Sequence, residues 1–372
     1  MTSNGFTVTH TYANRLMLDV DASVADVERT FHVNLRVFNH PAESRTFFAP
    51  DTDPALAEDL PISGVDGLDN FVLPHPASLH ATPGGHSTKA RPLNGSAPDG
   101  VSYIGSDFRH AYLPNVTLTG AGQTVGLFEL DGYFSTDINE YESTANLPNV
   151  PISNVLIDSY NGAAGDANDE VALDIDMAIC MAPGLSGVIV YEGDPNNPHA
   201  PNDILNRMAV DNLAKQLSCS WAWSYSFYIN SPPIDNIFME FAAQGQSFFA
   251  ASGDSGAYVN GNGILAPSDD PNITIVGGTT LNTDSSVNYL SEQVWNWLPG
   301  QTNASSGGVS PTYPIPSWQL GINMTANLGS TNNRNIPDVA LTADEIYIFA
   351  DDGTPEVLGG TSAAALTGFV KW

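Results

Sequence analysis

From Val101 onward, apolar runs rich in β-branched and aromatic residues alternate with amphipathic stretches of helical length. The apolar runs include TVGLFEL, NVLIDSY, GVIVYEG, KQLSCSWA, SFFAASG and ITIVGGTTL, and the helical stretches include STDINEYESTAN, DEVALDIDMAICM, NDILNRMAVDNL and IDNIFMEFAAQG. Strands that are apolar throughout are typical of a parallel sheet whose two faces are both covered by helices. We therefore expect an α/β fold with a ligand site at the carboxyl ends of the strands.

The segment before this domain divides into two parts. Residues 1–73 predict a small α+β unit, in which TVTHTYANRLMLDV gives two strands around a turn, and LRVF and SRTFFA give a second strand pair. Ser23 is expected to cap a helix that places Val27 and Phe31 on one face. Residues 74–100 are rich in Pro, Gly, Ser and His without periodicity, which predicts an exposed linker open to proteolysis. Residues 101–372 then form the main domain.

The charge of the chain is strongly negative, because it has 41 Asp and Glu residues but only 11 Lys and Arg residues, which gives a net charge of −30. Such a surface repels nucleic acid and anionic lipid, so neither is an expected partner. No apolar stretch approaches the roughly 20 residues of a membrane span. Two explanations of the charge remain open: a self-repelling soluble protein, or a protein that works at roughly pH 3–4, where carboxylates take up protons.

Cysteine and histidine usage excludes several common catalytic sites. Cys180 and Cys219 stand in apolar runs without a CxxC pair, so we expect both to be buried and free. Only His110 and His199 follow the linker. A Ser-His-Asp triad needs an imidazole base and a zinc site usually needs two or more histidines, so both are disfavoured. For the same reason, and because the pattern is α/β, Gly253–Gly256 (GDSG) is not interpreted as the serine segment of a trypsin-like enzyme.

Two carboxylates are candidates for acid–base chemistry. Glu170 and Asp174 are spaced i,i+4 on a helix expected over about 169–181, so they share one helix face. Two carboxylates this close do not ionise together easily, and one should keep its proton to a higher pH. A solvated acidic face is the alternative, but Asp174 lies within VALDIDMAICM, which is apolar enough to be mostly buried.

Asp254 and Ser362 complete the candidate set. Asp254 follows an apolar strand and stands between flexible glycine turns, although a simple Asx-turn is the alternative. Ser362 follows a Gly-Gly turn at the start of an Ala-rich helix, where backbone N–H groups favour a developing oxyanion; a plain N-cap is the alternative. Together these residues could combine a serine nucleophile, a carboxylate base suited to acid pH, and a protonated aspartic acid that donates to the oxyanion.

Eight segments occur in the order found in one known family: GQTVGLFELDGY, NDEVALDIDMAICMAPG, LSCSWAW, AASGDSGAY, ITIVGGTTL, SSGGVSPTYPIPSWQ, NIPDVAL and GGTSAAAL. With them, the domain from Val101 resembles the sedolisins, the serine-carboxyl peptidases, and most closely the kumamolisin-like members. Residues 1–73, which include the run GVDGLDNF, resemble the C-terminal part of the family's activation propeptide. The resemblance implies a subtilisin-like α/β domain preceded by a small α+β, ferredoxin-like propeptide portion.

The resemblance also implies roles for matched residues. Ser362 corresponds to the nucleophile, Glu170 to the general base, Asp174 to its hydrogen-bonded partner and Asp254 to the oxyanion-hole aspartate. Glu129 and Trp221 match residues that some relatives hydrogen-bond to the catalytic glutamate. The implied activity is that of a secreted, monomeric endopeptidase of acid pH that hydrolyses polypeptides. It would be made as a zymogen inhibited by residues 1–73 and would cut its own linker between about His86 and Val101.

Three further expectations follow from the resemblance. The family's calcium ligands would lie beyond Trp372, so no metal ligands are expected in this chain although calcium is expected for a longer protein. The propeptide match begins midway and no signal segment precedes it, so we expect a chain that is clipped at both ends and unstable or inactive in isolation. Two alternatives remain: a catalytically inactive extracellular binding protein on the same scaffold, and a two-carboxylate glycosidase, which would leave Gly-Thr-Ser-Ala unexplained.

Overall fold

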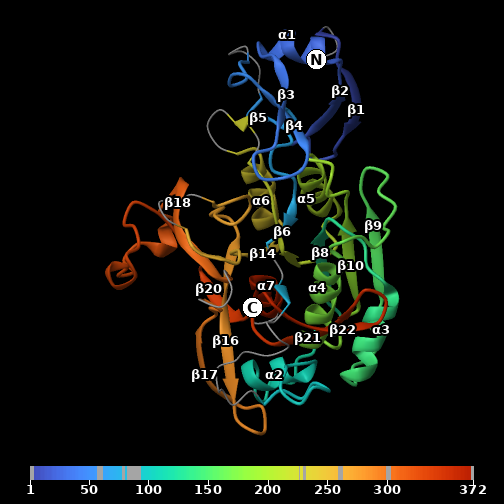
Figure 1. Ribbon diagram of the computed structural model, residues 1–372, viewed down its shortest axis with the longest axis vertical. Helices are drawn as coiled ribbons and strands as arrows, with labels where there is room; N and C mark the ends of the chain where they lie inside the picture. Colours follow the sequence, from blue (N-terminus) through green and yellow to red (C-terminus); the bar gives the residue numbers. More distant parts are fainter. Residues whose placement is uncertain are drawn as a thin grey trace.

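The centre of the molecule is an eight-stranded sheet with the order β17-β16-β14-β11-β8-β10-β9, in which β20 also pairs with β16 (Figure 1). The structure is a computed structural model that describes residues 4–369, apart from 57–61, 78–79, 82–93, 226, 229–231, 259–262 and 299–302. The strands are β8 (Thr124–Glu129), β9 (Ile152–Leu156), β10 (Gly187–Glu192), β11 (Gln216–Cys219), β14 (Ser247–Ala251), β16 (Thr274–Thr283), β17 (Tyr289–Val294) and β20 (Val339–Thr342). All pairings are parallel except that of β17 with β16.

Helices cover both faces of this sheet, as the sequence predicts. One face carries a layer formed by α2 (Ser106–Tyr112), α3 (Ser135–Thr144), α4 (Asn168–Met181) and α7 (Thr361–Phe369). The other face packs against α5 (Ala200–Asp211) and α6 (Ile234–Ala243). Burial on both faces explains why the central strands are apolar throughout, and the α/β fold class is confirmed.

Shorter strands complete the domain around this core. β18 (Ala304–Pro314) lies between β15 (Ser255–Ala257) and β19 (Asn333–Ile336). The hairpin of β21 (Ile346–Ala350) and β22 (Thr354–Gly359) leads directly into α7. Cys180 and Cys219 are buried and free, as the sequence predicts. None of the helices within the described part of the chain is long and apolar enough to cross a bilayer.

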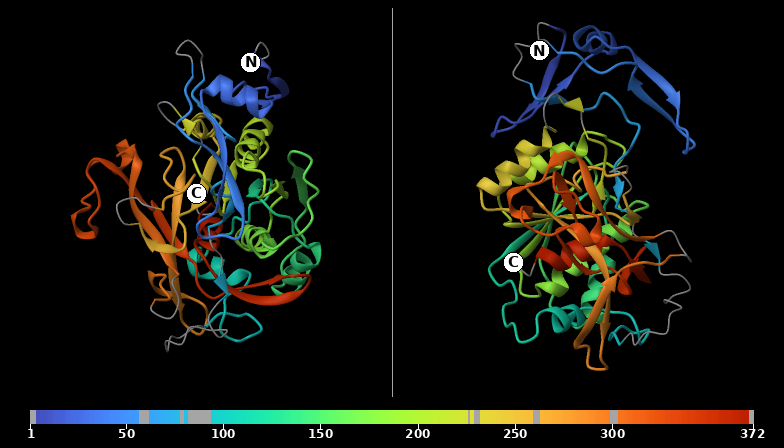
Figure 2. Two further views of the ribbon diagram at one scale, coloured as in Figure 1. Left: turned by 45° about the horizontal axis from the view of Figure 1, so that its top comes forward. Right: turned by 90° about the vertical axis from the view of Figure 1, so that its left-hand side faces the viewer.

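The N-terminal module lies at one end of the molecule, as Figure 1 and the right-hand view of Figure 2 show. Its elements are β1 (Thr7–Thr11), β2 (Leu18–Asp21), α1 (Val24–Phe31), β3 (Leu35–Asn39) and β4 (Thr46–Pro50). Ser23 caps α1 by accepting a hydrogen bond from the Asp26 amide at 3.2 Å, as predicted. The two hairpins form separate two-stranded sheets, so the described residues do not build the single sheet that a ferredoxin-like unit requires. A small core of Phe6, Phe31, Val33 and Leu68 holds them to the helix instead.

This module docks on α5 and α6 through side-chain hydrogen bonds. The Tyr12 hydroxyl donates to Asp203 at 2.8 Å, and the Asn14 amide donates to Asn206 at 2.6 Å. Strand β5 (Gly64–Val65) also pairs with β13 (Phe227–Tyr228) of the main domain. At Gly67 a Cβ atom would lie 1.5 Å from Cε1 of His199, so only glycine allows this close approach.

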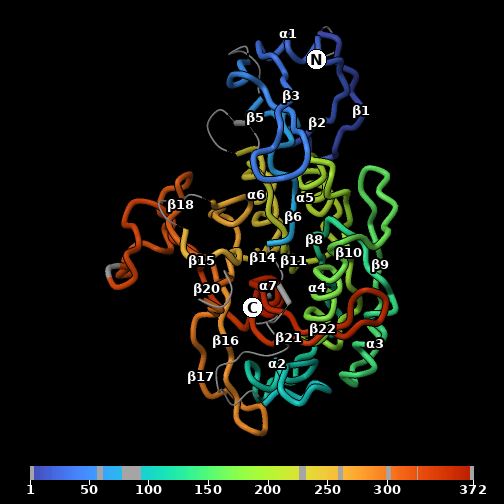
Figure 3. Tube along the Cα trace, viewed as in Figure 1, coloured from blue at the N-terminus to red at the C-terminus, as the bar shows by residue number. Residues whose placement is uncertain are grey.

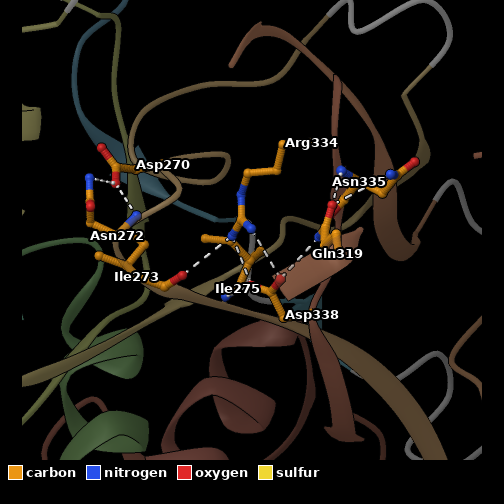
Figure 4. Close-up of polar contacts among 8 residues, drawn as sticks. All are labelled: Asp270, Asn272, Ile273, Ile275, Gln319, Arg334, Asn335 and Asp338. Carbon is orange, nitrogen blue, oxygen red and sulfur yellow. Dashed lines mark hydrogen bonds and ion pairs between the residues drawn. The ribbon is translucent and has the colours of Figure 1, made fainter. Parts of the chain in front are cut away.

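A buried arginine fixes the strands that support α7 (Figure 4). The Arg334 guanidinium donates to both carboxylate oxygens of Asp338, at 3.1 and 2.8 Å, and to the Ile273 carbonyl at 3.3 Å. Asp338 also accepts from the Ile275 amide at 2.9 Å. Bidentate pairing of this kind fixes geometry as well as charge. It therefore joins the start of β16 to β20, and α7 packs on both strands.

Candidate active site

Glu170 and Asp174 lie on one face of α4, and both side chains are fully buried. The helix begins at Asn168 and ends before Ala182-Pro183, close to the predicted range of 169–181. The solvated acidic face that the spacing alone allowed is therefore wrong. Because α4 packs against α7, the two carboxyls approach the helix that carries Ser362.

A chain of polar contacts extends from Asp174 to the neighbouring strand ends. The Ser220 hydroxyl donates to Asp174 at 2.9 Å, and the Trp221 indole donates to Glu129 at 2.8 Å. Glu129 ends β8, and its carboxyl lies close enough to that of Asp174 for each to shift the pKa of the other. The structure thus brings Glu129 and Trp221 together, but neither is hydrogen-bonded to Glu170, whose carboxyl oxygens have no partner among the described residues.

Asp254 lies in the turn that follows β14, three residues after the strand ends at Ala251. Its Oδ1 accepts hydrogen bonds from the backbone amide and the hydroxyl of Thr361, each at 2.8 Å. Its Oδ2 is buried and has no hydrogen-bond partner among the described residues. Gly253 adopts a φ of 98°, which turns the chain sharply out of the strand. Asp254 therefore keeps one carboxyl oxygen free beside the residue that precedes Ser362.

Ser362 is the second residue of α7 and is fully buried. Its hydroxyl makes no hydrogen bond among the described residues, but it lies close enough to Glu170 to lower the pKa of that carboxyl against the larger effect of burial. The Gly359-Gly360 turn places the hydroxyl at the N-terminal end of the helix. Glu170, Asp174, Asp254 and Ser362, which are far apart in the sequence, therefore meet in one site.

Burial dominates the electrostatics of these carboxyls. It raises the pKa of Glu170, Glu129 and Asp254 well above the usual range, and neighbouring carboxylates raise the pKa of Glu170 and Glu129 further. The pKa of Asp174 rises to about 8 through burial, although the Ser220 hydroxyl and the neighbouring Glu129 carboxyl act in the opposite direction. In the state described, the site therefore favours neutral carboxylic acids.

These shifts predict an unusual dependence of stability on pH. A carboxyl whose pKa is higher in the folded than in the unfolded state stabilises the fold fully below its unfolded value, and this contribution is lost as the pH rises through its folded value. For Asp174 this loss of stability extends from pH 3.8 to about pH 8. Each unit by which folding raises the pKa corresponds to about 1.4 kcal/mol of the free energy of unfolding. Thermal unfolding of the uncleaved Ser362→Ala protein should give a Tm that falls steadily from pH 4.5 to 8. Asp174→Asn should flatten that decline; a Tm that rises over this range would contradict the expectation.

A segment of the linker runs along the strand ends next to this site (Figure 3). Strand β6 (His75–Pro76) pairs antiparallel with β12 (Trp221–Ala222), and the Ala77 amide donates to the Ser220 carbonyl at 2.7 Å. Strand β7 (His80–Ala81) pairs antiparallel with the end of β22, which leads into Ser362. The described linker residues thus flank the site on both sides.

The two histidines of the main domain have other contacts. His110 hydrogen-bonds Asn288, and His199 packs on Gly67, as described above. No group of three or more His, Cys, Asp or Glu residues within the described ranges could hold a metal ion. No step below depends on a metal ion.

Sequence reasoning overlooked two residues of this site. Ser220 positions Asp174, and Thr361 binds Asp254 through both its amide and its hydroxyl. Both stand directly beside residues that were recognised, Trp221 and Ser362. The sequence offered one signal for Ser220 and Thr361, because each directly follows a predicted strand or its turn. A serine or threonine at such a position is more often a simple turn or cap residue.

The Pro-kumamolisin, activation domain family matches residues 1–71. Kumamolisin of Bacillus sp. (strain MN-32) is 31% identical over 359 residues, which cover 91% of this chain and 63% of that protein. Sedolisin of Pseudomonas sp. (strain 101) is 28% identical over 392 residues, which cover 97% of this chain and 64% of that protein. The chain thus spans a little less than two thirds of the length of these two relatives.

A solved structure gives the same answer for the fold. It is described as Pseudomonas sedolisin (serine-carboxyl proteinase) complexed with two molecules of pseudo-iodotyrostatin. It superposes with a TM-score of 0.61 at 27% identity, covering 73% of this chain and 79% of that chain. The fold, the activation-domain match and the two relatives agree: over nearly its whole length the chain is similar to the sedolisins, and it combines residues that match a pro-kumamolisin activation domain with a subtilisin-like domain that shares the fold of a sedolisin.

Proposed function

We propose that the protein is a serine-carboxyl endopeptidase that works at acid pH and hydrolyses polypeptides through an acyl-enzyme on Ser362. The observation that supports this most strongly is the convergence of Glu170, Asp174, Asp254 and Ser362 at one buried site without a histidine bonded to any of them among the described residues. We also propose that the protein is secreted and monomeric, and that a longer form of the chain needs calcium.

In the proposed reaction, the Ser362 hydroxyl oxygen attacks the substrate carbonyl carbon while its proton passes to the Glu170 carboxylate. Glu170 then returns this proton to the leaving amine as the C–N bond breaks, and water repeats the sequence to release the acid. Asp174 would pair with Glu170, which lies one turn away on α4, during the reaction; in the structure it is oriented by Ser220 at 2.9 Å. A carboxylate suits this role because the best pKa for a general base lies near the working pH.

Asp254 is suited to bind the oxyanion in its protonated form. Thr361 occupies Oδ1, which leaves the buried Oδ2 as the atom that carries the proton. Burial raises the pKa of Asp254, so the neutral acid persists to a higher pH than an exposed aspartic acid would. The donated hydrogen bond becomes strongest when charge develops on the carbonyl oxygen in the transition state.

Burial also suggests how the precursor is kept inactive. With the linker beside it, Ser362 is inaccessible and burial keeps Glu170 neutral, so Glu170 cannot accept a proton. Departure of the linker would admit water to the cleft and reduce the cost of ionising Glu170. We therefore propose that residues 1–73 and the linker together inhibit the catalytic domain until the chain is cut.

The first cut is expected directly after Ala77. Antiparallel pairing of β6 with β12 brings Ala77 to the carbonyl of Ser220, whose hydroxyl bonds the catalytic cluster. N-terminal sequencing after incubation at pH 4 should therefore give a chain that starts at Ser78. Ser78→Pro should block this cut, because proline there removes the amide N–H of the leaving group and stiffens the chain. The matched control Thr88→Pro should leave it intact.

The sequence placed the cut between His86 and Val101, and residues 86–93 of that window lie outside the described residues. A new N-terminus within this window, with none at Ser78, would contradict the register proposed here. Persistent processing in the Ser78→Pro protein at the position of the wild-type cut would contradict it as well.

A further inference from the structure

The Gly359-Gly360 turn that leads into Ser362 packs against the indole of Trp297. A Cβ atom at Gly359 would lie 2.5 Å from Cζ2 and 2.6 Å from Cη2 of this ring, and 3.1 Å from the nearest carbonyl oxygen. Gly359 is the last residue of β22, so its backbone is extended and would itself accept other residues. The contact with Trp297 is therefore the main reason for a glycine here, directly before the turn to the nucleophile.

A buried carboxyl holds the indole in this position. The Trp297 Nε1 donates to Oδ1 of Asp344 at 3.0 Å, and the Thr280 hydroxyl donates to Oδ2 of the same carboxyl at 2.7 Å. The Trp297 ring also meets the Trp295 ring at 81°, with 5.1 Å between the centroids. Asp344 and Trp295 are fully buried, and Trp297 is nearly so. In an interior this closely packed, Trp297 cannot change its rotamer without losing these contacts.

The loop that carries Asp344 also binds the turn itself. The Gly360 amide donates to the Ala343 carbonyl at 3.0 Å, and the Ala343 amide donates to the Thr279 carbonyl at 2.8 Å. Thr279 belongs to β16, and Ala343 directly follows β20, so both are attached to the central sheet. The turn is therefore fixed to the sheet by a backbone hydrogen bond and by its packing on the indole.

The position of this turn determines where the Ser362 hydroxyl lies. Thr361, the first residue of α7, binds Asp254 through its amide and its hydroxyl, each at 2.8 Å. Ser362 follows it and is buried beside Glu170. A displaced turn would move the hydroxyl relative to both carboxyls. A misplacement of about 1 Å can lower the rate of a reaction about 10²-fold.

We propose that Trp297 is a positioning residue for the nucleophile: its indole supports the Gly359-Gly360 turn and so sets the place of the Ser362 hydroxyl relative to Glu170. This inference rests on the reaction proposed above, but Trp297 takes no part in the bonds that form and break. Because Trp297 acts through the turn, its substitution should change kcat more than KM.

The pairing of the linker with β22 explains why KM should change little. Strand β7 pairs with the backbone of Leu358 and Gly359. Side chains of a strand stand roughly perpendicular to its backbone hydrogen bonds. A methyl group at position 359 would therefore press on Trp297 and leave the edge of β22 free to pair with an incoming chain.

An exchange of side-chain size between positions 359 and 297 tests this role. Gly359→Ala should lower kcat about 10²-fold, with KM within about threefold, because its methyl group displaces the turn. Trp297→Leu should lower kcat about tenfold through the loss of support. The double variant should recover the kcat of Trp297→Leu, because leucine lacks Cζ2 and Cη2 and leaves room for the methyl group. Each protein is first cut in the linker by added active protein, and a quenched peptide at pH 4 gives kcat and KM.

Two further variants separate this role from general stability. Trp318→Leu is the matched control, since Trp318 is 55% exposed on the short helix η4 (Ser317–Gln319). It should leave kcat within about twofold of the wild type. Trp297→Phe fills more of the site than leucine and should keep a Tm nearer that of the wild type. It also lacks Cζ2 and Cη2, so it should relieve Gly359→Ala as well.

The outcomes distinguish this inference from the proposed function. A kcat of Gly359→Ala within about twofold of an active wild type would overturn the role of Trp297 and leave the proposed reaction intact. Failure of both Trp297→Leu and Trp297→Phe to raise the kcat of Gly359→Ala would do the same. If the wild-type protein hydrolysed no peptide at any pH, the proposed peptidase function itself would fail, and this inference with it.

Discussion

Replacing Ser362 by alanine is expected to lower kcat/KM for peptide hydrolysis at least ~10⁴-fold in the full-length protein and to abolish self-cleavage. The hydroxyl is the nucleophile of the proposed reaction, and the residual site can only bind substrate and polarise its carbonyl. The substitution removes one oxygen atom from a buried position and should leave the fold intact. Hydrolysis of a quenched peptide and the mass of the chain after incubation at pH 4 measure both effects.

The matched control is Ser255→Ala. Ser255 belongs to the Gly-Asp-Ser-Gly segment that resembles a trypsin-like motif, but its residue is exposed and its backbone amide, not its hydroxyl, bonds Ser306. Hydrolysis should therefore continue within about twofold of the wild-type rate, because an exposed serine hydroxyl outside the site contributes little. Loss of activity in Ser255→Ala together with retained activity in Ser362→Ala would reverse the assignment. Retained activity in both variants would mean that another residue is the nucleophile, whereas a wild-type protein that binds peptides without hydrolysing them would support the inactive binding protein.

The second large effect concerns Asp254. Alanine at this position removes the oxyanion donor and should lower kcat about 10²- to 10³-fold. Asparagine should retain activity within about tenfold at pH 4, because its carbonyl oxygen can accept from Thr361 while its amide donates where the protonated Oδ2 would. The comparison distinguishes a donor from a residue that only packs.

The pH profile gives a sharper readout for the same pair. Burial raises the pKa of Asp254, so the acid is a donor below its folded pKa and a repulsive carboxylate above it. Activity of the wild type should therefore fall on the alkaline side as this group ionises. Asp254→Asn does not titrate, and its profile should extend to higher pH; a profile that superposes on that of the wild type would contradict the oxyanion role.

The sequence predicts the sheet well because its strands are buried on both faces. TVGLFEL, GVIVYEG and ITIVGGTTL each become central strands, since continuous apolar runs have no other stable position in a domain of this size. The N-terminal module is predicted less well. Its strands are mostly exposed, so pattern alone places β1 to β4 but does not determine that the two hairpins remain separate.

The candidate site also contains some residues that the sequence predicts and others that it does not. Asp174 could be recognised because an acid within an apolar helix must be buried, and Ser362 because a Gly-Gly turn precedes it. The contacts of Ser220 and Thr361 with these carboxyls depend on how separate strand ends meet, which no local pattern records. The path of the linker could not be predicted either, because Pro-rich segments without periodicity carry no signal for the strand with which they pair.

The central claim is that Ser362 attacks a carbonyl with help from Glu170 and Asp254. The most direct test adds a peptide aldehyde, labelled with ¹³C at its carbonyl carbon, to the processed protein at pH 4 and follows that carbon by NMR. Addition of the serine hydroxyl converts the aldehyde to a hemiacetal. We expect a hemiacetal signal from the protein and from Ser255→Ala, and none from Ser362→Ala that has been cut in the linker by added active protein. A hemiacetal that persists without Ser362 would show that another residue is the nucleophile.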